Sequence, residues 1–182
     1  MKRIILLLIC TCFTLISANA LSANFPQTYV EVAAAYGVPP EYLYAIAQTE
    51  SNTKLTIGYF PWPWTLNIAG VSKRFATYQE ACNAAESAIS RWGGKSVDIG
   101  IGQLNWGYNG HKYFNTPCES LNPRKNLEVT AYLLRGHFGT TGNWLEAAGM
   151  YHRPAGGEPA RRYKVEVKRR LDQMEVLTMR TY

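Results

Sequence analysis

The chain has 182 residues, of which 47% are hydrophobic and 18% charged, so it is long and apolar enough to form a single folded domain. Its formal net charge of +6 is too small an excess to indicate a nucleic-acid-binding protein. A mildly basic chain of this kind suits an acidic polymer or an anionic surface as its partner.

The first 20 residues have the pattern of a secretory signal peptide. Two basic residues precede an apolar run from Ile4 to Ile16, and a small-x-small motif ends at Ala20. An uncleaved membrane anchor is the alternative, although the run is shorter than the roughly 17 to 25 residues of a spanning helix. We expect cleavage after residues 1–20, export to the periplasm, and one domain over residues 21–182 with a net charge of about +4.

Two helices are expected at the start of this domain. The first covers Pro26 to Tyr36 and ends at Gly37, a residue that tolerates the backbone geometry of a helix end. The second begins at Pro40, because proline is favoured in the first helical turn, and ends within residues 51–53.

Glu50 lies on the apolar face of this second helix, where a surface glutamate is not expected. At about 100° per residue it shares that face with Leu43, Ile46 and Ala47. Burial disfavours a charged carboxylate and raises its pKa, so the group can keep a proton and donate it to a leaving oxygen. Cleavage of a glycosidic bond needs this property. A buried glutamate that only accepts structural hydrogen bonds is the alternative.

The middle of the chain mixes extended and helical patterns. Prolines exclude a helix over residues 54–76, and Ala69-Gly70 is expected to form the turn of a small β-hairpin. Thr77 and Glu80 have capping-box spacing, which predicts a helix as far as Gly93. The residues expected on its inward face are Tyr78, Ala81, Cys82, Ala85, Ile89 and Trp92.

Three more helices are expected to complete the domain. They begin near Asn122, Asn143 and Pro159, and each carries apolar residues at helical spacing. The predicted fold is therefore mainly α, an α+β domain that is compact and helical, with a small β-hairpin after the helix that carries Glu50.

Cys82 and Cys118 are the cysteines that remain after cleavage of the signal peptide. Export to an oxidising compartment predicts a disulfide between them, with two free buried thiols as the alternative. The three histidines are scattered, and no cysteine and histidine cluster has the spacing of metal ligands. We expect neither a metal nor a cofactor.

Residues 98–110, with the sequence DIGIGQLNWGYNG, combine glycines, neutral amides and aromatic rings. The glycines allow close backbone approach, while Gln103, Asn105 and Tyr108 offer hydrogen-bonding groups. Trp106 and Tyr108 also offer flat apolar faces, and this combination suits a sugar. A tight turn whose amides cap neighbouring helices is the alternative.

Four segments, AIAQTESN (45–52), GIGQLN (100–105), LNPRKNLEVTAYLL (121–134) and AAGMYH (147–152), together resemble, in their order, the motifs of SLT-type, lysozyme-like lytic transglycosylases. AIAQTESN (45–52) looks like the Glu-Ser motif, and GIGQLN (100–105) is similar to Gly-Leu-Met-Gln-Ile/Leu, with glycine where methionine is usual. LNPRKNLEVTAYLL (121–134) looks like the Asp-Pro segment, with Asn122 for the aspartate. AAGMYH (147–152) is similar to Ala-Ala-Tyr-Asn.

This resemblance implies a lysozyme-like fold and peptidoglycan glycan strands as the substrate. Glu50 would be the single catalytic acid and base, and the product would be a 1,6-anhydro sugar. No second carboxylate is required if the substrate's own acetamido group stabilises the developing positive charge. Two alternatives stay open: a muramidase in which Asp98 acts as nucleophile or water base, and a wall-binding assembly protein without catalysis.

The expected substrate-binding residues lie in these motifs and in the glycine-rich loop: Ser51, Gln103, Asn105, Tyr108, Tyr151 and His152. Ser51 would support the helix end or hydrogen-bond near Glu50. Tyr151 would hydrogen-bond Glu50 or the substrate acetamido group. His152 stands where the family usually has asparagine, and is either a residue of the cleft or a surface histidine.

Residues 54–96 form a longer spacer between the first two motifs than is usual in the family. Within this spacer, the run PWPWTLN resembles relatives carried by integrating conjugative elements, and the Tyr-His version of the last motif is common in a subgroup attached to secretion and conjugation systems. The resemblance implies wall opening for such an apparatus, whose components would be partners. Trp62 and Trp64 would either form a rim that stacks sugars or pack in the core.

Overall fold

The computed structural model describes residues 25–179, with side chains as far as Glu175. The α-helices in this range are α1 (Gln27–Tyr36), α2 (Pro40–Ser51), α3 (Tyr78–Trp92), α4 (His111–Tyr113), α5 (Pro123–Thr141), α6 (Trp144–His152) and α7 (Glu158–Met179). The strands are β1 (Asn52–Leu55), β2 (Gly58–Pro61), β3 (Thr65–Ile68), β4 (Val71–Arg74), β5 (Val97–Ile99) and β6 (Leu104–Asn105). The predicted signal peptide lies outside the described residues.

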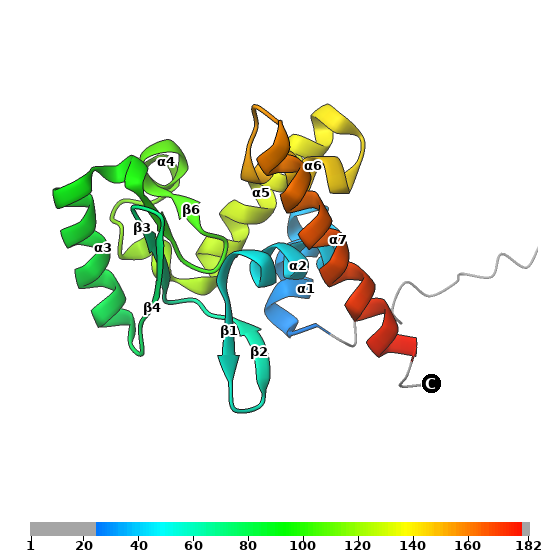
Figure 1. The fold of residues 1–182 in the computed structure, drawn as a ribbon, viewed down its shortest axis with the longest axis horizontal. Coiled ribbons are helices and arrows are strands. Elements are labelled where there is room, and N and C mark those ends of the chain that lie inside the picture. Colours follow the sequence, from blue (N-terminus) through cyan, green and yellow to red (C-terminus); the bar gives the residue numbers. More distant parts are fainter. Residues whose placement is uncertain (1–24, 180–182) are drawn as a thin grey trace, which may run out of the picture.

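Helix α2 is the centre of the helical part of the molecule, where it packs against α1, α5, α6 and α7 (Figure 1). Leu43, Ile46 and Ala47 are fully buried, which confirms the apolar stripe predicted for this helix. Leu134 of α5 and Val167 of α7 belong to the same core. The surrounding helices therefore fix the position of α2, and with it the residue at its end that carries the chemistry.

The sheet part of the molecule is a four-stranded antiparallel sheet in the order β4-β3-β5-β6, packed against α3 (Figure 1). Leu66 of β3 and Ile99 of β5 are buried against Ala81 and Ala85 of α3. Because successive side chains of a strand point to opposite faces, the polar residues that alternate with these apolar ones point away from α3.

Helix α3 begins at the predicted capping box, in which Thr77 and Glu80 each bond the other's backbone N–H. The middle of its predicted inward face is buried, but the prediction is wrong at both ends, since Tyr78 is 42% exposed and Trp92 54%. A helix of 15 residues is about 22 Å long, whereas a strand of four residues spans about 13 Å. The ends of α3 therefore extend beyond the sheet that covers its middle.

The β structure is larger than the sequence predicted. The hairpin that turns at Ala69-Gly70 is confirmed as β3 and β4, with Ile68 opposite Val71. A second hairpin, β1–β2, follows α2 directly, because Ser51 ends the helix and Asn52 begins β1. Strands β5 and β6 also lie within the segment that the sequence suggested was a loop.

A disulfide joins Cys82 of α3 to Cys118, as the sequence predicted. The two cysteines are 36 residues apart in the sequence. Closing a loop of this length stabilises a fold by about 4 kcal/mol in the chain-entropy model. The bond ties the outer helix of the sheet part to the segment that leads into α5.

The described structure confirms a mainly helical α+β domain with a small antiparallel sheet. Among the described helices, none combines the length and the apolar character needed to cross a membrane.

Candidate active site

A cavity of about 710 Å³ lies between the helical part and the sheet part. Its lining residues are Thr49, Glu50, Asn67, Ser72, Arg74, Asp98, Gln103, Leu104, Asn105, Tyr108, Asn109, Tyr151, His152, Arg153 and Pro154. All the predicted catalytic and substrate-binding residues except Ser51 are among them. We call Glu50, Tyr151, His152 and Arg153 the helical wall, and Asn67, Ser72, Arg74, Asp98 and Asn105 the sheet wall.

Glu50 lies in the last turn of α2, partly shielded from solvent, at the helical wall. Burial raises the pKa of its carboxyl from the ordinary 4.5 to about 8, and repulsion from Asp98 acts in the same direction. A hydrogen bond from Tyr163 opposes this shift, because it stabilises the ionised form. At neutral pH the carboxyl therefore keeps its proton, as the sequence-based argument required.

Tyr163 of α7 holds this carboxyl, and the sequence analysis did not identify it as a site residue. Its buried hydroxyl donates to Glu50 Oε1 at 2.7 Å. Its ring stacks on His152, with ring centroids 4.5 Å apart and planes at 5°. Burial raises the pKa of the Tyr163 phenol well above its ordinary value, so the hydroxyl stays protonated as a donor. Among the described residues, Oε2 of Glu50 has no hydrogen-bond partner, which leaves that oxygen to a substrate.

Tyr151 makes a different contact from the one first considered for it. Its hydroxyl donates to the backbone carbonyl of Gly102 at 2.5 Å and lies 3.4 Å from Thr130 Oγ1. The hydrogen bond to Glu50 comes from Tyr163 instead. Contact between Tyr151 and a substrate acetamido group stays a prediction, since Tyr151 does line the cavity.

Ser51 connects α2 to the glycine-rich loop rather than lining the cavity. It is fully buried, and its Oγ lies 2.9 Å from the carbonyl oxygens of both Ala47 and Ile101. This contact fixes the end of α2 against the loop. The expectation that Ser51 supports the helix end agrees with this geometry.

Asn126 of α5 anchors the glycine-rich loop from the other side, and the sequence analysis gave it no role. Its side chain accepts a hydrogen bond from Gly102 N at 2.8 Å and donates to the carbonyls of Ile99 and Ser120 at 3.0 and 2.8 Å. A Cβ at Gly102 would collide with side chains of α5, and Gly100 has a φ of +84°. Gly100 and Gly102 therefore allow this part of the loop to pack closely against α5. The geometry here agrees with a tight turn, which was the alternative to a sugar-binding loop.

Gln103 is held in an unusual backbone conformation at the cavity. Its φ of +49° lies in the left-handed region, which residues other than glycine rarely adopt. Its side-chain amide donates to the carbonyls of Thr65 and Gly100 at 3.0 and 2.7 Å, which holds the turn in place. Backbone strain of this kind concentrates at functional sites.

A row of four polar residues crosses the sheet wall, one from each strand. Ser72 lies opposite Asn67, Asn67 opposite Asp98, and Asp98 opposite Asn105. Asn105 donates to Asp98 Oδ1 at 2.7 Å. Burial raises the pKa of Asp98, while this hydrogen bond lowers it. Asn67 and Ser72 were not predicted from the sequence, although the alternation of apolar and polar residues along β3 indicates which side chains face away from α3.

Tyr108 and His152 lie at the rim of the cavity. Tyr108 is 57% exposed, and Lys95 Nζ lies 5.2 Å from the centre of its ring. His152 is exposed on the opposite side, where burial of part of its ring and the charge of Arg153 lower its pKa below 6.5. Its ring is therefore neutral at neutral pH, and one face of the ring is covered by Tyr163.

Trp62 and Trp64 do not line this cavity. Trp62 Nε1 donates to the Phe75 carbonyl at 2.8 Å, and the two indole rings form an edge-to-face pair with centroids 5.4 Å apart. Trp64 also packs against the core under the sheet. Of the two alternatives for these rings, the geometry agrees with packing.

Within the described residues, Cys82, Glu86 and Cys118 form the single group of three potential metal ligands. Both sulfurs are joined in the disulfide, so the group offers no thiolate to an ion. The expectation of no metal and no cofactor stays a prediction.

Comparisons of the chain with protein-family models, with curated proteins and with solved structures found no match.

Proposed function

We propose that this protein is a lytic transglycosylase that cleaves the β-1,4 bond between N-acetylmuramic acid and N-acetylglucosamine in peptidoglycan. The observation that carries this proposal is a carboxyl with a pKa of about 8, oriented by Tyr163 at the edge of a cavity. The cavity volume is in the range of roughly 300 to 1,000 Å³ that is typical of ligand pockets. Its polar walls suit the hydroxyl and acetamido groups of a glycan.

In the proposed reaction Glu50 acts first as an acid and then as a base. Protonated Oε2 donates its proton to the glycosidic oxygen, the bond from that oxygen to C1 breaks, and the acetamido oxygen stabilises the positive charge at C1. The Glu50 carboxylate then accepts the proton of the C6 hydroxyl while O6 bonds to C1. The product is the 1,6-anhydro sugar, and Glu50 returns to its protonated state.

A pKa of about 8 suits both steps. At neutral pH the resting carboxyl carries the proton that the first step needs. After that step the carboxylate is a stronger base than an ordinary glutamate, because the same partly dry site disfavours its charge. Tyr163 holds Oε1 throughout, so a single oxygen faces the glycan.

A hydrolytic muramidase is the second candidate, and the position of Asp98 favours it. Asp98 lines the same cavity and contributes to the raised pKa of Glu50. If Asp98 activates a water, the products carry a reducing end in place of the anhydro ring. Its hydrogen bond from Asn105 is equally compatible with an orienting role in the sheet wall.

Product analysis separates these candidates. Purified peptidoglycan is digested with the wild type, Glu50→Gln and Asp98→Asn, and the released muropeptides are identified by mass spectrometry. We expect products one water lighter than reducing-end muropeptides. Glu50→Gln should release them about 10³-fold more slowly, since it removes the proton donor. Asp98→Asn should keep the anhydro product.

Each other outcome identifies an alternative. Reducing-end products that disappear in Asp98→Asn would establish the muramidase. Binding of peptidoglycan by the wild type without any release would indicate the non-catalytic wall-binding protein. Undiminished release by a correctly folded Glu50→Gln variant would remove Glu50 from the mechanism.

We also propose that the protein acts in the periplasm and opens the wall locally for a conjugation or secretion apparatus. The supports are the signal-peptide pattern, the PWPWTLN run and the Tyr-His version of the last motif. Deletion of the gene should lower transfer or secretion, and the wild type but not Glu50→Gln should restore it. Unchanged transfer, secretion and assembly after deletion would contradict this role.

A further inference from the structure

Arg74 ends strand β4 and lines the same cavity as the proposed catalytic acid. Its guanidinium donates to three uncharged oxygens: to Thr53 Oγ1 at 2.9 Å, to Ser72 Oγ at 2.7 Å and to the carbonyl of Asn52 at 2.8 Å. These contacts join β4 to β1 and hold the side chain in one orientation. They leave its positive charge uncompensated.

Arg74 differs in this respect from most of the surface arginines. The described arginines that form ion pairs with carboxylates are Arg124, Arg161, Arg162, Arg169 and Arg170. Among the described side chains, four arginines form no such pair: Arg74, Arg91, Arg135 and Arg153. Of these, Arg91 and Arg135 lie over aromatic rings, while Arg74 and Arg153 line the cavity. The cavity therefore has a cation on each of its two walls.

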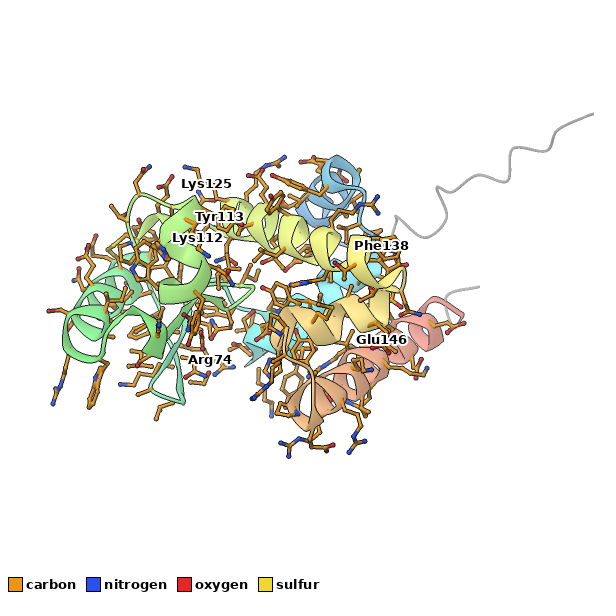
Figure 2. The ribbon with its side chains drawn as sticks, turned by 90° about the horizontal axis from the view of Figure 1, so that it is seen from above. Arg74, Lys112, Tyr113, Lys125, Phe138 and Glu146 are labelled. Atoms are coloured by element: carbon orange, nitrogen blue, oxygen red, sulfur yellow. A yellow bond between two sulfur atoms is a disulfide. The ribbon has the colours of Figure 1, made fainter. Side chains whose placement is uncertain are left out.

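The acidic residues of the cavity offset this charge only in part. Burial raises the pKa of both Glu50 and Asp98, so the two carboxyls favour their neutral form more than ordinary acids do. Figure 2 shows Arg74 beside the sheet, on the side away from Lys112 and Lys125. A ligand that enters between the walls thus meets Arg74 as an oriented cation that is separate from those surface lysines.

The hydrogen bonds of Arg74 also leave donors free for a ligand. A guanidinium has five N–H groups, and the three contacts use one each on Nε, Nη1 and Nη2. One N–H remains on each terminal nitrogen. A guanidinium with a free N–H on each terminal nitrogen can donate to a carboxylate.

We propose that Arg74 is a specificity-determining residue that binds a carboxylate attached to the muramic acid units of the glycan strand. The inference rests on the proposed function and deepens it. Two sources supply this chemistry: a carboxylate of the stem peptide, or the lactyl carboxylate that is free when the peptide is absent. Because Arg74 lies within the spacer, residues 54–96, this recognition belongs to the segment in which the chain departs from the family it resembles.

Binding measurements on a non-cleaving background test this role. Isothermal titration calorimetry with Glu50→Gln would compare three glycan strands of equal length: with free stem-peptide carboxylates, with those carboxylates amidated, and without peptides. The test variant adds Arg74→Gln. The matched control adds Lys73→Gln, which makes the same charge change on the same strand but at a residue outside the cavity lining.

We expect Arg74→Gln to weaken binding about tenfold, and Lys73→Gln to leave it unchanged. A loss confined to strands with free stem-peptide carboxylates identifies the peptide as the source. A loss confined to peptide-free strands identifies the lactyl group. In about 1 M salt, where the screening length falls to about 3 Å, the difference should largely disappear. Equal affinities of the Arg74→Gln and Lys73→Gln variants for all three strands would overturn the proposal.

A conservative variant guards against a purely structural effect, because Arg74 also joins β4 to β1. Arg74→Lys keeps the charge and loses the paired donors, so it should bind about threefold more weakly than the control. If Arg74→Gln fails to fold by circular dichroism, Arg74→Lys decides, and affinity equal to that of the control overturns the proposal. Product analysis of the wild type reports separately on the reaction: Arg74-dependent binding without anhydro product would contradict the proposed function and uphold this inference.

Discussion

The two walls of the cavity are built from different secondary structure and present different chemistry. The helical wall places Glu50 at the end of a helix in which Leu43, Ile46 and Ala47 are fully buried, and the pKa of Glu50 is far from its ordinary value. The sheet wall presents a row of hydrogen-bonding side chains, Ser72, Asn67, Asp98 and Asn105, one from each strand. The helical wall can therefore change the state of a proton, whereas the sheet wall can hold and orient a polar ligand.

This difference follows from how each element is packed. Helix α2 is enclosed by other helices, so a carboxyl at its end loses water on most sides. The sheet has α3 on one face, and its other face meets the cavity, so alternate residues along its strands stay polar. The three experiments that follow test this division of roles, from the largest expected effect to the smallest.

The largest effect concerns how the free energy of unfolding depends on pH, because the pKa of Glu50 is raised in the folded state. The folded pKa of Glu50, about 8, lies above the ordinary value of 4.5, so its contribution to stability is fully present below pH 4.5 and is lost as the pH rises through 8. Glu50→Gln does not titrate. Relative to the wild type, we expect the free energy of unfolding of this variant to rise by up to about 4 kcal/mol between pH 4 and pH 8. Urea unfolding at both pH values measures it, and an equal stability difference at both would contradict a dry helical wall.

The next effect concerns Asn126, which fastens the glycine-rich loop between the two walls. Asn126→Ala leaves Gly102 N and two carbonyls without their buried partner, and should lower the free energy of unfolding by about 3 kcal/mol. Asn83→Ala, at an exposed position of α3, is the control and should change it by less than about 0.5 kcal/mol. A similar change in the free energy of unfolding for both variants would show that the hydrogen bonds of Asn126 do not stabilise the fold around the cavity.

The smallest effect concerns Tyr163 and appears in the pH profile. If Glu50 is the acid, kcat falls as the pH rises through about 8. Tyr163→Phe removes a hydrogen bond that stabilises the carboxylate, so the pKa of Glu50 rises and the falling limb moves to higher pH, while kcat drops about tenfold. Tyr132→Phe is the control, because Tyr132 is exposed and does not line the cavity. If kcat falls at the same pH in Tyr163→Phe as in the wild type, this hydrogen bond does not influence the pKa of Glu50.

The sequence predicted the helices because these depend on local patterns, and it predicted the disulfide because two cysteines remain after the expected cleavage. The apolar stripe of α2, the capping box at Thr77 and the cap at Asn122 are each contained in a few adjacent residues. The burial of Glu50 followed from the same stripe. Its raised pKa agrees with that reasoning.

The short strands and several site residues could not be predicted in this way. Strands β5 and β6 have three and two residues, and what defines them is pairing with partners that include the distant β3. Tyr163 lies 113 residues from Glu50 in the sequence, and nothing in the residues around it indicates that its hydroxyl reaches that carboxyl. Arg74 was missed because the polar acceptors that orient it, Thr53 and the Asn52 carbonyl, come from another hairpin.

The abrupt passage from α2 into β1 has an electrostatic consequence for the acid. Helix α2 ends at Ser51, one residue after Glu50, so the carboxyl lies in the turn where the peptide dipoles of the helix leave about half a negative charge. That field opposes ionisation and adds to the effect of burial. The end of the helix and the burial of the side chain therefore both raise the pKa of Glu50, although one acts through the backbone and the other through the loss of water.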